Sequence, residues 1–289
     1  MKTNKYEDAF GKFQKPESEK EISKKVQQII EENASKQLTP KILKEIHGLI
    51  DLTSLTSLDT RDSIWKLVEH VNDYEGTRPD VPNVAAICTY PIFVETVKQA
   101  LTAQEVSIAA VSAGFPSSQT FQEVKIAETS LAVMNGANEI DIVLNLGYFM
   151  EENYEELTEE IDEIKEACRD AKLKVILETG ALVTAELIQK AAILAMYSGA
   201  NFLKTSTGKG FPGATPEAVY TLCQTIKTYY ELTGTKIGIK VSGGVKTTEE
   251  AVAYYCIVKE VLGEEWINKA LFRIGASGLL SNIEHRLGE

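Results

Sequence analysis

Short apolar runs alternate with amphipathic segments along most of the chain. Eight runs have the length of a strand, and they occupy residues 49–52, 83–88, 106–113, 139–145, 174–179, 201–205, 236–241 and 271–276. Apolar residues recur with helical spacing in eight segments that lie after these runs, at residues 61–71, 93–101, 120–134, 154–171, 185–197, 216–232, 249–262 and 279–287. Because a helix follows each strand, the strands are expected to be parallel and buried on both faces.

The strand and helix unit repeats eight times, with a spacing of roughly 23 to 35 residues that suits a (β/α)8 barrel of about 250 residues. A doubly wound open sheet is the alternative, since alternation alone does not show whether the sheet closes. Eight such units favour a sheet that closes into a barrel. The pattern therefore predicts the α/β class and a single (β/α)8 TIM barrel over residues 38–289.

Residues 1–37 are polar and charged, and we predict an N-terminal helical extension there, outside the barrel. A helix is expected to begin near Pro16, and its spacing gives one apolar stripe, made of Ile22, Val26, Ile29 and Ile30. This stripe is interpreted as the contact face of a packed or loosely ordered appendage, with a regulatory or oligomerising arm as the alternative. Thr39 and Pro40 predict the start of a second, short helix.

Composition excludes several classes of function. The net charge of −12 argues against nucleic acid as a partner, because its phosphates would be repelled. No segment approaches 18 consecutive apolar residues, so we predict no membrane contact and a cytoplasmic protein. The four cysteines are scattered and read as reduced thiols. The three histidines fall in helical patterns, so we expect no zinc site and no cofactor.

Two lysines stand in apolar strands that should be buried. Lys204 interrupts one strand and Lys240 the next, while strand alternation turns Asp141 towards the interior of the barrel. A buried lysine is often simply paired with a carboxylate, but two lysines at neighbouring strand ends exceed what pairing requires. Burial and an adjacent cation can lower a lysine pKa from about 10.4 to about 7, which raises the neutral fraction roughly a thousandfold. Such a neutral amine is the nucleophile of Schiff-base catalysis.

The loops after the last three strands have the composition of a phosphate site. They contain Thr207, Gly208 and Lys209, then Gly243 and Gly244, then Ser277 and Gly278. Glycines let backbone N–H groups approach an anion closely, and a helix N-terminus adds its dipole. Two further strand ends carry Glu178 and Cys88, of which Cys88 is interpreted as a core thiol that could react with aldehydes.

With these residues in place, the chain closely resembles the deoxyribose-phosphate aldolase family, class I aldolases on a TIM barrel. The matching stretches follow the family order over residues 49–280, and they are 50–53, 83–91, 114–116, 136–143, 177–180, 202–209, 238–245 and 273–277. The resemblance implies reversible cleavage of 2-deoxy-D-ribose 5-phosphate to D-glyceraldehyde 3-phosphate and acetaldehyde, a step in deoxyribose phosphate catabolism.

The resemblance also implies residue roles. Lys204 would form the Schiff base, and Asp141 and Lys240 would handle protons and lower the pKa of Lys204. Gly208, Lys209, Gly243, Gly244, Ser277 and Gly278 would surround the phosphate, with Thr207 beside the substrate. Some members end in a tail whose terminal tyrosine helps to move a proton, whereas this sequence ends in Arg286-Leu-Gly-Glu289. Proton transfer would then rely on Asp141, Lys240 and water.

Two other functions stay open from the residues alone. One is a different barrel enzyme acting on sugar phosphates, such as an isomerase or a metal-dependent aldolase. The other is a non-catalytic phosphosugar sensor that has kept the anion site. In each case the partners would be small molecules, phosphorylated sugars and, for the aldolase, short aldehydes; a homo-oligomer, with a dimer favoured, is the expected assembly.

Overall fold

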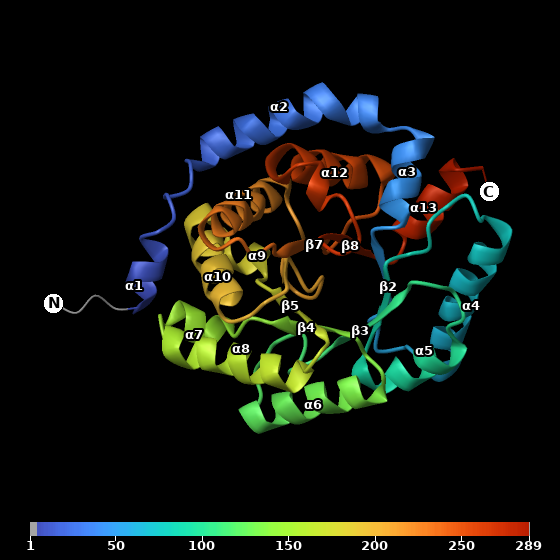
Figure 1. Ribbon diagram of the computed structural model, residues 1–289, viewed down its shortest axis with the longest axis horizontal. Coiled ribbons are helices and arrows are strands. Elements are labelled where there is room, and N and C mark those ends of the chain that lie inside the picture. Colours follow the sequence, from blue (N-terminus) through green and yellow to red (C-terminus); the bar gives the residue numbers. More distant parts are fainter. Residues whose placement is uncertain (1–4, 289) are drawn as a thin grey trace.

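Eight parallel strands close into a barrel at the centre of the computed structural model, which describes residues 5–288 (Figure 1). The strands are β1 (Ile50–Thr53), β2 (Ala86–Thr89), β3 (Ser107–Val111), β4 (Glu139–Val143), β5 (Lys172–Ile176), β6 (Phe202–Lys204), β7 (Gly238–Ser242) and β8 (Phe272–Ala276). Each strand pairs with the next one in sequence, and β8 pairs with β1 through Ile274 and Ile50. The predicted closed barrel is confirmed, and the open sheet was the wrong alternative.

All eight helices predicted to follow the strands are present. They are α4 (Arg61–Thr77), α5 (Val94–Ala100), α6 (Gln122–Asn135), α8 (Tyr154–Cys168), α10 (Ala185–Tyr197), α11 (Pro216–Thr233), α12 (Thr248–Leu262) and α13 (Leu279–Arg286). Four of them begin after a threonine whose hydroxyl accepts a backbone N–H three residues on, at Thr60, Thr184, Thr215 and Thr247. This cap satisfies one of the free N–H groups of the first turn and fixes where each helix starts.

Short elements that have no periodic pattern were not predicted. They are α7 (Leu146–Met150), α9 (Thr179–Leu182) and the 3₁₀ turns η1 (Pro91–Phe93) and η2 (Glu264–Trp266). With three to five residues each, they are too short to show a helical repeat. They lie in the connections between the strands and the long helices, so they change the loops and not the architecture.

The N-terminal segment forms three helices, α1 (Lys5–Phe10), α2 (Glu19–Gln37) and α3 (Pro40–His47). Helix α2 lies along the outside of α11 and α12 (Figure 1). Ile22 and Val26 are buried in that contact, and Ile29 and Ile30 are partly buried against the same core. The packing of the stripe against the main domain is as expected, whereas the separate N-terminal extension, its boundary at residue 37 and the alternative of an oligomerising arm stay untested.

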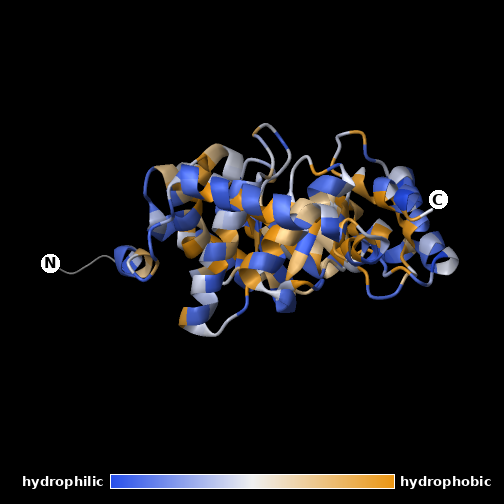
Figure 2. Ribbon diagram, turned by 90° about the horizontal axis from the view of Figure 1, so that it is seen from above, coloured by the Kyte–Doolittle hydropathy of each residue, from blue (hydrophilic) through white to orange (hydrophobic). Residues whose placement is uncertain are grey.

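Apolar residues fill the layer between strands and helices, while hydrophilic residues lie on the outer helix faces (Figure 2). The space inside the barrel is divided differently. Its apolar wall consists of buried side chains on and next to β1, β2 and β3, namely Leu55, Ala86, Cys88, Ala109 and Val111. Charged side chains from β4 to β8, together with Asp51 on β1, occupy the rest. Within residues 5–288 the structure holds no helix long and apolar enough to span a membrane.

Candidate active site

The three residues proposed for chemistry meet inside the barrel. Lys204 ends β6, and its register partner on β7 is Lys240. Both Nζ atoms donate to the same carboxylate oxygen, Oδ2 of Asp141 on β4, at 2.8 Å each. Asp141 and Lys240 are fully buried, and Lys204 is 3% exposed. The predicted inward direction of Asp141 and the predicted proximity of the two lysines are confirmed.

A third lysine in this cluster was not predicted. Lys174 Nζ lies 2.7 Å from Oδ1 of Asp141 and 2.7 Å from Glu139, and the side chain is fully buried. The sequence interpretation placed the strand at residues 174–179, but β5 covers Lys172–Ile176. This shift puts Lys174 in the middle of the strand, with the apolar Leu173 and Val175 on the outer face. The alternation of Lys174 with apolar residues along the strand was the sequence signal that could have shown that this side chain points into the barrel.

Arg273 on β8 links two further carboxylates to the cluster. Its guanidinium donates to Asp51 on β1 at 2.6 Å and to Glu139 at 2.7 Å. Asp51 also lies 2.6 Å from Lys240. The buried cluster thus has three carboxylates (Asp51, Glu139 and Asp141) and three cations besides Lys204 (Lys174, Lys240 and Arg273). Its charges balance when Lys204 is neutral.

The surroundings shift the pKa values of Lys204 and Lys240 in opposite directions. Burial lowers the pKa of Lys204, and the positive charge of Lys240 adds to this against the attraction of Asp141. Burial also disfavours the charged form of Lys240, but Asp141 and Asp51 outweigh it and hold its pKa well above the usual range. Burial opposes ionisation of Asp141, yet Lys174, Lys204 and Lys240 keep its pKa well below the usual range. When two residues of the same type have pKa values shifted in opposite directions, they are suited to different chemical roles.

A cavity of about 490 Å³ opens above the lysines at the carboxyl ends of the strands. Lys204 and Lys240 line it together with Thr207, which was expected beside the substrate, and five of the six residues expected around a phosphate, namely Gly208, Lys209, Gly243, Gly244 and Ser277. Gly278 does not line this cavity; it precedes the first turn of α13. Glycine is required at position 243, where φ is +92° and a Cβ atom would approach Gly213 to 2.8 Å.

Glu178 was noted as a strand-end carboxylate but given no role. It follows β5 in the left-handed region, with φ +53°, and is 2% exposed. Its carboxylate accepts the Thr207 hydroxyl at 2.5 Å and the Thr207 N–H at 3.2 Å. Burial raises the pKa of Glu178, against these hydrogen bonds, which lower it.

Cys88 lies on the apolar wall inside the barrel and is fully buried. Burial raises the pKa of this thiol, so its reactive thiolate form is disfavoured. The core assignment is confirmed. The reaction with aldehydes is untested by these contacts, and the burial of the thiol disfavours it. The three histidines lie in helices α3, α4 and α13, as expected. Among residues 5–288 no three His, Cys, Asp or Glu side chains are grouped to hold a metal ion.

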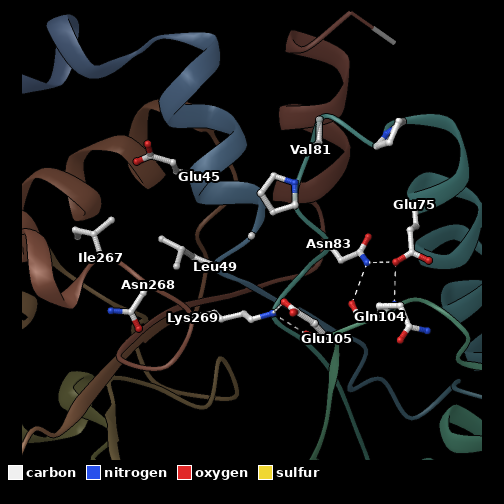
Figure 3. A pocket seen from close by; sticks show the side chains of 13 residues that line it. Glu45, Leu49, Glu75, Val81, Asn83, Gln104, Glu105, Ile267, Asn268 and Lys269 are labelled. Atoms are coloured by element: carbon white, nitrogen blue, oxygen red, sulfur yellow. Dashed lines mark hydrogen bonds and ion pairs between the residues drawn. The ribbon is translucent and has the colours of Figure 1, made fainter.

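A second cavity, of about 580 Å³, lies at the opposite end of the barrel (Figure 3). It is formed by residues just before β1, β2, β3 and β8, so it faces away from the lysines. Its polar side chains already pair with one another, Asn83 with Glu75 at 2.6 Å and Lys269 with Glu105 at 2.7 Å. In (β/α)8 enzymes the active site lies at the carboxyl ends of the strands, so the smaller cavity is the candidate site.

Comparison with known proteins agrees with this geometry. Residues 48–281 match the DeoC/LacD family of aldolases. The human deoxyribose-phosphate aldolase is 39% identical over 248 residues, covering 82% of this chain and 78% of the human protein.

Solved structures give the same result. The aldolase QR15 is 30% identical with a TM-score of 0.69, over 84% of this chain and 96% of its own. The tetrameric deoxyribose phosphate aldolase of Aeropyrum pernix is 23% identical with a TM-score of 0.68, over 94% and 99% of the two chains, and shows the shared fold. The chain therefore belongs to the DeoC/LacD aldolase family and, within it, is a lyase of the deoxyribose-phosphate aldolase type.

Proposed function

We propose that this protein reversibly cleaves 2-deoxy-D-ribose 5-phosphate into D-glyceraldehyde 3-phosphate and acetaldehyde through a Schiff base on Lys204. The observation that carries the proposal is the charge balance of the buried cluster, in which Lys204 is the surplus cation. An amine that is neutral in its resting state can attack a carbonyl carbon. The names of the relatives supply the substrate.

In the synthetic direction, Lys204 Nζ attacks the carbonyl of acetaldehyde, one proton is taken up from water through Asp141 and Lys240, and water leaves, giving a protonated imine. The positive nitrogen draws electrons, so the methyl group becomes acidic. Asp141, with Lys240 and water, takes that proton and an enamine forms. Its carbon attacks the aldehyde of the phosphorylated partner, and hydrolysis of the new imine frees Lys204. Asp141 is suited to this relay, because its oxygen lies 2.8 Å from the reacting nitrogen.

The loops around the cavity support binding of the phosphate. Lys209 brings a positive side chain, now held 2.5 Å from the carbonyl oxygen of Leu55. The turn at Gly208 and the Gly243-Gly244 pair bring backbone close to the same space. In a protein with a net charge of −12, these groups supply the local attraction that an anionic substrate needs.

Reduction with borohydride in the presence of acetaldehyde tests the chemistry directly. We expect a stable adduct, mapped by mass spectrometry to Lys204 in the parent and absent in Lys204→Met. Lys236→Met, which changes a lysine outside the barrel cavity, is the matched control and should keep the adduct. An isomerase or a phosphosugar sensor would give no adduct at any lysine, and that result would remove the proposal.

We also propose a cytoplasmic enzyme that works without a cofactor and assembles as a homodimer. The described residues contain no membrane-spanning helix, which is compatible with this location. Light scattering on the purified chain tests the assembly, since a single species of twice the 31.8 kDa chain mass is expected.

A further inference from the structure

Glu178 is a buried carboxylate for which the proposed reaction has no use. Its backbone adopts the left-handed conformation with φ +53° and ψ +59°, which residues other than glycine rarely adopt. The side chain is 2% exposed and lies in the turn between β5 and α9. A residue held in this way by its surroundings is usually fixed for a purpose at or near a site.

The carboxylate fixes the orientation of the Thr207 hydroxyl. The Thr207 O–H donates to Glu178 Oε2 at 2.5 Å, and the Thr207 N–H donates to Oε1 at 3.2 Å. Because its proton is directed to Glu178, Oγ1 of Thr207 is available as an acceptor. The backbone N–H of Lys209 donates to it at 2.9 Å. The carboxylate thereby closes the turn of residues 207–209, whose members line the cavity above the lysines.

Close backbone packing links the same loop to its neighbours on both sides. A Cβ atom on Gly180 would overlap the carbonyl of Pro212, and one on Gly213 would overlap the carbonyl of Gly243. The N–H of Ala214 also donates to the carbonyl oxygens of residues 242 and 243 at 3.2 Å. The loop after β6 is therefore rigidly placed between the loops after β5 and β7, and Glu178 secures it at the end nearest Lys204.

A carboxylate suits this position better than an amide of the same shape. Thr207 presents two donors, its N–H and its O–H, and an ionised carboxylate offers acceptors alone. Glutamine would turn one NH₂ group towards a donor, so one hydrogen bond would be lost or the hydroxyl would rotate away from Lys209. A buried donor without a partner is unfavourable, and the turn would relax to find one.

We propose that Glu178 is a positioning residue for the phosphate of the substrate, acting through Thr207 on the turn of residues 207–209. The inference rests on the proposed function, because it names the group that this turn would hold. Glu178 has no hydrogen bond or ion pair with the lysine cluster, so it reaches the chemistry at Lys204 only through the longer-range attraction between the two charges, which acts equally on substrates with and without a phosphate. Loss of the carboxylate should therefore weaken recognition of a phosphorylated substrate and spare an unphosphorylated one.

Glu178→Gln tests this with two substrates that differ in the phosphate alone. For 2-deoxyribose 5-phosphate we expect KM to rise about tenfold, the effect of one lost hydrogen bond, with kcat changed less than about twofold. For 2-deoxyribose both constants should stay within about twofold. Equal losses on the two substrates, or none on either, would overturn the proposal. Glu186→Gln, an exposed pair partner of Lys190 on α10, is the matched control.

Thr207→Val is a second variant for the same test, and it keeps the proposal testable if Glu178→Gln does not fold. Thr207 itself lines the cavity beside the substrate, so this change affects both substrates, but KM should rise about tenfold more for 2-deoxyribose 5-phosphate than for 2-deoxyribose. The double variant should add little to this difference, because both changes act on one hydrogen-bonded unit. An additive double variant would contradict the coupling.

Calorimetric binding of inorganic phosphate separates this inference from the proposed reaction. Phosphate binding needs no imine, so it should weaken about tenfold in Glu178→Gln or Thr207→Val even if the parent formed no borohydride adduct. A missing adduct would then count against the reaction alone. Unchanged phosphate affinity in both variants would count against the positioning role.

Discussion

Replacing Lys240 with methionine removes the ammonium group beside Lys204 and keeps most of the length of the side chain. Both Nζ atoms lie 2.8 Å from the same oxygen of Asp141, so they are at most twice that distance, 5.6 Å, apart. At an effective dielectric constant of about 20, two like charges at this separation repel by roughly 3 kcal/mol. This energy corresponds to about two pKa units.

The expected result is a loss of rate that pH can reverse. In Lys240→Met, the pKa of Lys204 should rise by about two units, so the neutral fraction and kcat/KM near pH 7 should fall roughly a hundredfold. Removing the cation also leaves Asp51 and Asp141 less neutralised, which favours a protonated Lys204 further. Since the neutral amine is the active form in the proposed mechanism, activity should rise with pH through the pKa of Lys204, and the rise should begin about two units higher in the variant.

The assay is the pH profile of kcat/KM for 2-deoxyribose 5-phosphate, with thermal unfolding to confirm that the variant folds. Lys236→Met is the control, because that side chain pairs with Glu265 outside the barrel. A profile for Lys240→Met that overlays the parent, at near-normal rate, would refute the assignment of Lys240. A low rate that higher pH does not restore would show that Lys240 moves protons and does not tune Lys204.

Three further outcomes follow from the same contacts. Asp141→Asn should slow turnover by about 10² to 10⁴, the usual worth of a positioned acid or base, and single-turnover kinetics would detect a normal rate if the relay were elsewhere. Although burial opposes ionisation, His47 and His70 lower the pKa of Glu284 to about 2, so its stabilisation is present above about pH 4.5 and lost as pH falls towards 2. In urea unfolding between these pH values, the parent should lose about 1–3 kcal/mol more stability than Glu284→Gln, after allowance for solvent screening. Because burial raises the pKa of Cys88, Cys88→Ser should lose activity in excess acetaldehyde as fast as the parent; slower loss would show that this thiol reacts.

The sequence was sufficient to predict the architecture. Eight strand and helix units with parallel strands leave few arrangements, and periodicity located long helices closely, as at Ala185–Tyr197. The ends of short buried strands were located less closely, because nothing within a continuous apolar run shows at which residue hydrogen bonding to the neighbouring strand begins. The two-residue shift at β5 hid the direction of Lys174 and therefore its place beside Asp141.

The charge balance of the site could not be read from the sequence. Arg273 and Glu139 are 134 positions apart, and their ion pair exists because closure brings β8 and β4 to the same interior. The contact on which the proposed role of Glu178 depends was hidden for a similar reason. Its partner Thr207 belongs to the next loop, and the left-handed turn that aims the carboxylate at it follows no sequence rule for glutamate.

Lys204 and Lys240 are chemically the same and face each other, so their different pKa shifts must come from their carboxylate neighbours. Among the described side chains, Lys240 lies within 4 Å of both Asp51 and Asp141, whereas Lys204 meets Asp141 alone. The second carboxylate is what keeps Lys240 charged, and a charged Lys240 in turn favours a neutral Lys204. In the proposed mechanism, the choice of Lys204 as the nucleophile would thus be decided on β1, at Asp51, a residue that touches neither Lys204 nor the cavity that the substrate would enter.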